Sequence, residues 1–362
     1  MIVIDGSYGE GGGQVLRTSL TLSALLSKPV RIENIRAKRR NPGLQAQHLT
    51  GVRAIAQICD AELEGADLGS QTLTFKPRSS PRAGEYRFDV AEARKGGSAG
   101  ATSLVFQTLL LPLAHASGQS RLTIRGGTHV AWSPSFHYLK HVYLPTLARM
   151  GLEATAEIVK WGWYPIGGGE IIASIRGQQG HYLSGLDLVE RGALKRLWGI
   201  SATSNLPSHI GQRQKKRTED YLRKRGFDPQ IKIVYAPSPG QGTAVFLAAE
   251  YEHTIAGFSS LGARGKPAEK VAEEACREFL AYHQSGAGLD RHLADQMILP
   301  MALASGSSAF TTCEITQHLL TNIWVVERFL DVRFEIEGEE GEKGRVRKRQ
   351  ASKGLRSEAW GA

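Results

Sequence analysis

The stretch that decides the fold is Asp5-Gly-Ser-Tyr-Gly-Glu-Gly-Gly-Gly-Gln-Val-Leu-Arg17, near the start of the chain. It follows a short apolar strand, Ile2 to Ile4, and precedes apolar residues at helical spacing. Glycines in such a strand-to-helix turn let backbone amides approach phosphate oxygens, and a helix N-terminus adds positive partial charge. The turn matches neither a Walker A motif nor a dinucleotide fingerprint, so the pattern alone leaves a structural turn and a phosphate site equally open.

The elements that follow this turn recur twice further along the chain. The first copy continues with an alternating strand, Val30 to Ile35, and a helix from about Leu44 to Ile58. The order helix, strand, helix returns at 109–116, 121–127 and 136–150, and again at 293–303, about 309–312 and 318–327. Self-similarity of this kind predicts an α/β (α+β) fold of three repeated units.

Histidines in the last helix of each copy show where a further module is inserted. The interval from His137 to His318 is about twice the interval from His48 to His137, and the excess is the size of a small domain. Residues 181–285 carry strand and helix patterns of their own, so we expect an inserted α+β domain there. The repeats then occupy 1–180 and 286–336, and 337–362 is expected to be a charged, mobile tail.

Composition limits the function classes. The 362 residues carry a formal net charge of +10, with 41% apolar and 22% charged residues, which is typical of a soluble globular protein. The excess of Lys and Arg favours polyanionic partners such as nucleic acid. No apolar run is long enough to span a membrane, and we expect an intracellular, cytoplasmic protein. The three cysteines are too far apart to indicate a disulfide framework or a zinc site.

Two groups of residues could bind phosphate or RNA. Glu10 in the turn could hold magnesium, and Arg17 could grip a phosphate through its guanidinium group. The run Arg36-Ala-Lys-Arg-Arg40 is usually a solvated charged loop, but Gln47 and His48 close behind it can hydrogen-bond a ribose or a terminal phosphate. An RNA-end site therefore stands beside the simpler interpretation.

Two further motifs have both a structural and a chemical interpretation. The glycines in Trp161-Gly-Trp-Tyr-Pro-Ile-Gly-Gly-Gly-Glu-Ile171 favour a tight packing point between elements. The segments His292-Leu-Ala-Asp-Gln296 and Thr316-Gln-His-Leu-Leu-Thr-Asn322 each place a histidine near a helix start. Such a histidine is usually structural, although an unprotonated ring nitrogen can also act as a covalent nucleophile.

Taken together, these motifs resemble the RNA 3′-terminal phosphate cyclase family, in its catalytic branch. The resemblance runs from Ile2 to about Glu335 and covers both glycine motifs, the basic loop and the two C-terminal motifs. It implies three α/β repeats with a smaller domain inserted before the third, a fold related to that of the carboxyvinyl transferases. It also implies an ATP-dependent ligase that needs Mg²⁺ or Mn²⁺ and turns an RNA 3′-phosphate into a 2′,3′-cyclic phosphate. The expected route passes through a histidine-AMP adduct and an RNA-adenylate, and it releases AMP and pyrophosphate.

The resemblance assigns roles to individual residues. His318 falls on the nucleotide-accepting histidine, Glu10 and Arg17 on metal and phosphate ligands, and Asp295 on the central polar residue of the nucleotide-binding segment. Further nucleotide contacts are expected at Gln107, Pro134, Tyr138, His292, Leu293, Ala294 and Gln296. Positions near the RNA phosphate are Arg36, Arg39, Gln47 and His48. The chain departs from the family at His292, where tyrosine is usual, and at Trp161, where a basic residue is usual.

Two other functions compete with this interpretation. Non-catalytic relatives that serve in ribosome assembly lack the histidine, so His318 together with Glu10, Arg17 and Asp295 argues against a pure binding protein. A carboxyvinyl transferase would need no ATP, and the basic excess and the His318 motif favour RNA. The expected partners are therefore ATP and RNA with a 3′-terminal phosphate, with no membrane, and a homodimer is compatible with the sequence.

Overall fold

The computed structural model describes residues 1–178 and 183–349. Within this part, the first repeat contains four strands and two helices: β1 (Ile2–Asp5), α1 (Gly13–Leu26), β2 (Val30–Glu33), α2 (Ala46–Cys59), β3 (Glu62–Glu64) and β4 (Leu73–Lys76). The strand order is β1-β2-β4-β3, with β1 parallel to β2 and the other neighbours antiparallel.

The second repeat has the same topology, with the order β5-β6-β8-β7. Its strands and helices are β5 (Glu85–Asp89), a short 3₁₀ helix (Val90–Ala93), α3 (Thr102–His115), β6 (Ser117–Gly126), β7 (Ala154–Lys160) and β8 (Gly169–Gln178). Between β6 and β7, one helical segment passes from α4 (Phe136–Tyr138) through a π-helical turn (Leu139–Tyr143) into α5 (Leu144–Ala148).

The third repeat again has this arrangement, and it is interrupted by the inserted module. Its elements are β9 (Asp187–Leu188), α8 (Arg291–Leu303), β14 (Ser308–Thr312), α9 (Gln317–Phe329), β15 (Arg333–Glu337) and β16 (Gly344–Arg349), in the strand order β9-β14-β16-β15. The three-repeat prediction is confirmed. The structure refines the insertion point, because β9 pairs with β14 and so belongs to the third repeat although it precedes the insert.

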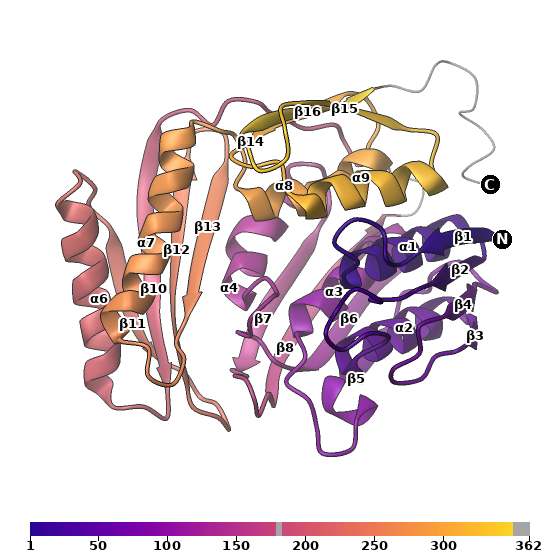
Figure 1. The fold of residues 1–362 in the computed structure, drawn as a ribbon, viewed down its shortest axis with the longest axis horizontal. Coiled ribbons are helices and arrows are strands. Elements are labelled where there is room, and N and C mark those ends of the chain that lie inside the picture. The colour runs from indigo at the N-terminus through magenta and orange to yellow at the C-terminus, as the bar shows by residue number, and fades with distance from the viewer. Residues whose placement is uncertain (179–182, 350–362) are drawn as a thin grey trace.

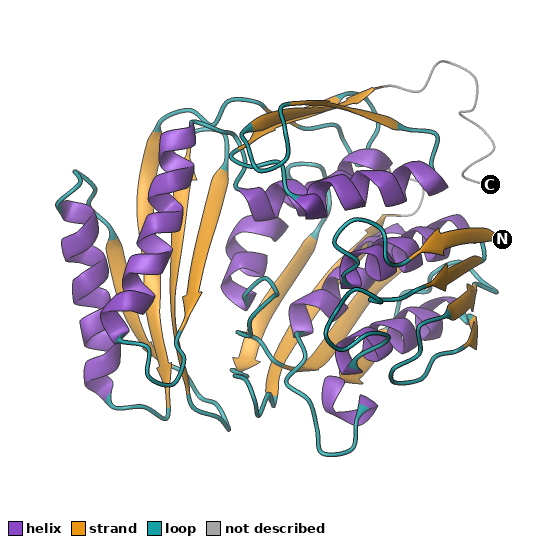
Figure 2. Cartoon of the chain, in the orientation of Figure 1, coloured by secondary structure: helices purple, strands orange, loops and turns teal. Residues whose placement is uncertain are grey.

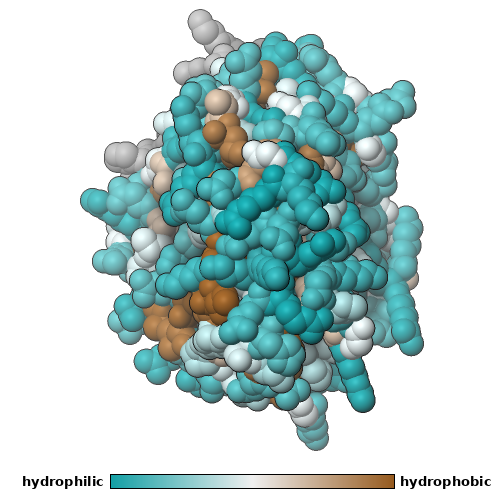
Figure 3. Space-filling view, turned by 90° about the vertical axis from the view of Figure 1, so that its left-hand side faces the viewer, coloured by the Kyte–Doolittle hydropathy of each residue, from teal (hydrophilic) through white to brown (hydrophobic). Residues whose placement is uncertain are grey.

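The insert forms a four-stranded sheet with two helices on one side (Figure 1). Its elements are β10 (Leu194–Ser204), α6 (Ser208–Arg223), β11 (Gln230–Tyr235), β12 (Gly242–Tyr251), β13 (Ile255–Leu261) and α7 (Ala268–Ser285). It has an apolar core of its own, which includes Leu247 and Phe279. Arg213 of α6 pairs with Glu269 of α7, and the face seen in Figure 3 is largely hydrophilic.

One boundary in the sequence prediction is wrong. Residues 337–349 were expected to belong to a mobile tail, but β16 lies between β14 and β15 in the third sheet. Val346 is fully buried, and Lys348 is buried with its ammonium group donating to the carbonyl of Ala304. The side chains on the opposite face of the strand are basic, which hid the alternating pattern. Residues 350–362 lie outside the described part of the chain.

The helices of the repeats gather in the interior, with the sheets outside them (Figure 2). Helix α1 contacts α2, α3 and α9, and α8 packs on α9. Their apolar faces share one core across the three repeats. This packing brings the glycine turn before α1, the start of α2 and the starts of α8 and α9 toward one region. No helix in the described residues is long and apolar enough to cross a membrane.

Candidate active site

The glycine turn of the first repeat lies along one face of α9 in the third. The ring of Tyr8 stacks on Trp324, with centroids 3.9 Å apart and planes 9° from parallel. A Cβ atom at Gly9 would lie only 2.2 Å from Oγ1 of Thr321, and Glu10 Oε2 lies 2.9 Å from His318 Nε2. Residues three apart in a helix share a face, so three successive turn residues lie against α9 residues that are spaced three apart on one face.

His318 sits at the accessible end of this contact. It is the second residue of α9, whose N-terminus is capped by Thr316 accepting the N–H of Leu319 at 3.0 Å. About half of its side-chain surface, 46%, is exposed. A histidine in this position can meet a substrate from solvent while its ring is oriented by Glu10.

Glu10 also pairs with the basic loop. Arg39 Nη2 lies 2.8 Å from the same Glu10 oxygen that contacts His318. Burial alone would raise the pKa of Glu10, but the hydrogen bond and charge of His318, with Arg39, bring it below its ordinary value. Glu10 is therefore a carboxylate at neutral pH, held between a histidine and an arginine.

Arg36 has a different contact from Arg39. Its Nη1 donates to the carbonyls of Asn41 and Gly43, at 2.6 and 3.0 Å, so it braces its own loop. Burial, with the nearby charge of Arg39, lowers the pKa of Arg36. The two arginines that the sequence placed together near an RNA phosphate thus point to different partners.

A second layer of polar side chains ties three helices together behind His318. Asn322 Nδ2 donates to the backbone carbonyl of Asp295 at 2.7 Å, while its Oδ1 accepts from Gln14 and Thr18 of α1, each at 2.8 Å. The hydroxyl of Thr316 donates to the Asp295 carboxyl group. Burial raises the pKa of Asp295 to about 7, against the opposing effects of Thr316 and His318. This network fixes the starts of α8 and α9 relative to α1.

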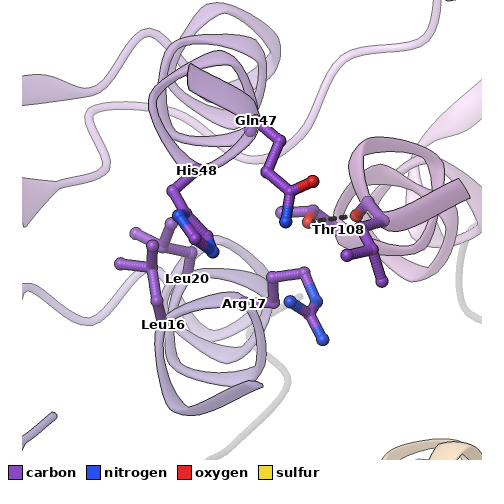
Figure 4. A pocket seen from close by; sticks show the side chains of 8 residues that line it. Leu16, Arg17, Leu20, Gln47, His48 and Thr108 are labelled. Carbon is purple, nitrogen blue, oxygen red and sulfur yellow. Dashed lines mark hydrogen bonds between the residues drawn. The ribbon is translucent and has the colours of Figure 1, made fainter. Parts of the chain in front are cut away.

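A small pocket opens between α1, α2 and α3 (Figure 4). Figure 4 shows Gln47 and His48 on one side of it and Arg17, with Leu16 and Leu20, on the other. Burial lowers the pKa of Arg17 to about 10, so it stays charged at neutral pH. From the sequence, Arg17 was assigned to the nucleotide, whereas Gln47 and His48 were assigned to the RNA. In the structure all three line one pocket.

The pocket histidine and glutamine are oriented by backbone contacts. His48 Nδ1 accepts the N–H of Gln45 at 3.2 Å at the start of α2, and Gln47 Oε1 accepts the N–H of Ala101 at 2.9 Å. Burial, followed by the charges of Arg36 and Arg17, lowers the pKa of His48 to about 3. His48 is therefore neutral at physiological pH, with its Nδ1 acting as an acceptor.

The residues expected around the nucleotide gather near the start of α8. Asp290 caps this helix by accepting the N–H groups of His292 and Leu293, each at 3.0 Å. Tyr138 is buried and donates its hydroxyl to Asp290 at 2.8 Å, and Gln107 donates to Gln296. His292 is exposed and lies edge-on to Tyr138.

The remaining expected nucleotide contacts differ in accessibility. Leu293 and Ala294 are fully buried, whereas Pro134 is partly exposed and accepts the hydroxyl of Ser103 through its carbonyl at 2.8 Å. Leu293 and Ala294 therefore offer no exposed surface to a ligand in this conformation.

A family model described as RNA 3′-terminal phosphate cyclase matches residues 8–336. The chain belongs to the RNA 3′-terminal phosphate cyclase family. A protein of Methylococcus capsulatus with that name is 51% identical over 347 residues, which is 96% of each chain. The corresponding proteins of Trichormus variabilis and Pyrobaculum neutrophilum are 52% and 46% identical, over 91% and 92% of this chain and 94% of each relative. The chain is therefore an enzyme of the cyclase family.

Among solved structures, the enolpyruvyl transferase NikO from Streptomyces tendae is similar to 49% of this chain, at 16% identity and a TM-score of 0.28. That score is too low to relate the two folds, and the relationship to carboxyvinyl transferases stays a prediction.

Within the described residues, the side chains alone do not form a metal cage. Among residues 1–178 and 183–349, no group of three or more His, Cys, Asp or Glu side chains could hold a metal ion. Magnesium in nucleotide sites commonly keeps several waters and uses one or two carboxylates together with substrate phosphates. Glu10 could take that role, because its carboxylate is ionised and 19% of its side-chain surface is exposed.

Sequence reasoning missed part of the site. Gln14, Thr18 and Asn322 connect the helices that carry His318 and Arg17, and Tyr8 and Trp324 clamp the turn. Gln14 and Asn322 both lie inside quoted motifs, which was the available signal. The stacked pair had no signal, because its two rings are more than 300 residues apart in the sequence.

Proposed function

We propose that this cyclase converts an RNA 3′-terminal phosphate into a 2′,3′-cyclic phosphate at the expense of ATP, with His318 as the residue that accepts AMP. The observation that supports this most is the position of His318. Its half-exposed ring lies at the open end of the glycine turn, 2.9 Å from an ionised Glu10 that is also paired with Arg39. The arrangement combines a nucleophile, an orienting carboxylate and a cation beside a turn suited to phosphate.

In the first step, an unprotonated ring nitrogen of His318 attacks the α-phosphorus of ATP. A nitrogen–phosphorus bond forms, the bond to the bridging oxygen breaks, and pyrophosphate leaves. Glu10 orients the ring and can accept the hydrogen bond of its N–H group. Arg39 and Arg17 would offset the negative charge of the triphosphate in a partly desolvated site.

Glu10 would also hold the divalent metal that the family resemblance implies. When bound, Mg²⁺ would neutralise phosphate charge next to the attacking nitrogen. Both contacts of Glu10, to His318 and to Arg39, use Oε2, so Oε1 could bind the ion while these contacts remain.

In the second step, an oxygen of the RNA 3′-phosphate takes AMP from His318 and forms an RNA-adenylate. The neighbouring 2′-hydroxyl then attacks the 3′-phosphorus, AMP leaves, and the cyclic phosphate remains. Covalent geometry already holds this hydroxyl close, so activation of the phosphate is the main requirement. Arg17, Gln47 and His48 offer a cation and two neutral hydrogen-bonding groups to the terminal phosphate, at the mouth of a pocket that is too small to enclose the ribose.

The test is conversion of a short RNA with a labelled 3′-phosphate in the presence of ATP and Mg²⁺. The expected product keeps its label after phosphatase treatment, because a cyclic phosphodiester is not a substrate for that enzyme. Reactions without ATP should leave the label removable. Phosphatase-sensitive label after a complete reaction would refute the proposed activity. The homodimer and the cytoplasmic location stay predictions.

A further inference from the structure

Two large aromatic side chains of the second repeat are largely exposed to solvent. Trp132 is 99% exposed and Tyr164 is 78% exposed. Trp132 also has a φ of +64°, in the left-handed region that side chains other than glycine rarely adopt. A strained backbone that presents a bare indole to solvent favours a role in binding over one in folding.

The two aromatics come from loops that lie side by side. Trp132 belongs to the loop between β6 and α4, and Tyr164 belongs to the loop between β7 and β8. The N–H of His129 donates to Gly162 at 3.2 Å, and His129 forms a bridge with Trp163. Ile166, which is 57% exposed, extends the apolar surface of the second loop.

Both loops rest on the segment 98–101, which borders the pocket of Arg17. Val130 packs with Ala101 and Leu104, and Leu104 lines that pocket. In the other loop, a Cβ atom at Gly167 would lie 2.9 Å from Cα of Ala99. The N–H of Ala101 in turn donates to Gln47 in the pocket. The exposed aromatics are therefore connected, through one short segment, to the residues assigned to the RNA end.

We propose that Trp132, Tyr164 and Ile166 form a stacking surface for the bases of the RNA strand that leads to the 3′-phosphate. This inference rests on the proposed function. Unpaired bases stack on aromatic rings with little sequence preference, which suits an enzyme that must accept different RNA ends. We call these three residues the base platform.

The surroundings favour RNA over other occupants. Arg94 and Lys95, both exposed, precede the segment 98–101 and offer cations for phosphates of the same strand. The adenine of ATP is expected elsewhere, at the start of α8 near His292. The loops of the base platform pack on the segment that borders the pocket, and the chain carries a net charge of +10. A polyanion with bases is therefore the best-fitting occupant.

The test compares two RNA lengths in variants of the base platform. Trp132→Gly removes the indole and relieves the positive φ, so the protein should be at least as stable as the wild type in thermal unfolding. Tyr164→Ala removes the second ring. Trp132→Phe keeps a ring, and Val3→Ala is a matched control because Val3 is an exposed apolar residue on β1.

For a decanucleotide with a 3′-phosphate, Trp132→Gly and Tyr164→Ala should each raise KM by about 5- to 150-fold, as expected for loss of one base stacking on a ring. KM for a dinucleotide should change much less, and self-adenylylation with ATP alone should be unchanged. Trp132→Phe should fall between Trp132→Gly and the wild type, and Val3→Ala should match the wild type.

Several results would overturn the base platform. They are an unchanged decanucleotide KM in both variants, an equal rise for both RNA lengths, impaired self-adenylylation, or a marked loss of thermal stability in both Trp132→Gly and Tyr164→Ala. Failure of the proposed function would look different, because the wild type itself would then not cyclise either RNA. A wild type that cyclises both RNAs alongside indifferent variants refutes the base platform alone.

Discussion

Replacing Gly9 by alanine should separate the glycine turn from α9 and thereby disable His318. Gly9 has a φ of +58°, and its missing Cβ would lie 2.2 Å from Thr321 Oγ1. The new methyl group must push the turn away from the helix, and Glu10, the next residue, would then lose its contact with His318. We expect a loss of self-adenylylation of at least about tenfold, the effect of about 1.4 kcal/mol on the barrier.

The size of the stability change can be divided into two causes. A left-handed alanine costs about 1–2 kcal/mol, and overpacking a buried contact costs about 1–3 kcal/mol more. Gly69→Ala is the matched control, because Gly69 has a φ of +79° and nothing within 4 Å of its Cβ position. Gly69→Ala should show the cost of the left-handed backbone without the cost of overpacking, and its self-adenylylation should be normal.

A double variant tests the cause of the effect. Thr321→Ala removes Oγ1 and leaves Thr321 Cβ at 3.4 Å from the new methyl group, which is ordinary contact. Gly9→Ala combined with Thr321→Ala should therefore recover much of the lost adenylylation, measured as transfer of label from ATP to the protein. Normal activity in Gly9→Ala, or an equal loss in Gly69→Ala, would refute the reasoning that contact with α9 positions Glu10.

Two other predictions concern charge. Burial raises the pKa of Asp295 from an ordinary 3.8 to about 7 in the folded protein. The wild type should therefore lose stability relative to Asp295→Asn as the pH rises from about 4 to 7, by up to about 1.4 kcal/mol per pH unit. Above pH 7 the difference should stay constant. Denaturant unfolding of both proteins across this range measures the difference, and a gap that stays constant with pH would contradict the raised pKa. Arg39→Ala should slow self-adenylylation more than Arg36→Ala, since Arg39 contacts Glu10 whereas Arg36 donates to its own loop. Equal rates in the two variants would show that the contact with Glu10 is not used.

The repeats could be predicted from the sequence because their main helices and strands carry strong periodic patterns. Two boundaries could not. Strand β9 has only two residues, Asp187 and Leu188, which is too short for a period to appear. Strand β16 buries Lys348, so its inward face did not look apolar.

Candidate site residues could be named from the sequence, but their contacts could not. His318, Glu10 and Arg17 lie in motifs, and their roles stay predictions. Which of Arg36 and Arg39 reaches Glu10 depends on how one loop packs, and a run of basic residues does not encode that. The alignment of residues 8 to 10 along α9 depends on the packing of the first repeat against the third, which local sequence does not record.

The proposed role of His318 is tested most directly by locating the nucleotide on the protein. The enzyme is incubated with ATP labelled in the α-phosphate and with Mg²⁺, and the labelled peptide is then sequenced. We expect AMP on His318, through a bond that is labile to acid and stable to base, and no label on a folded His318→Ala protein. Label on another residue, or label retained by His318→Ala, would contradict this role.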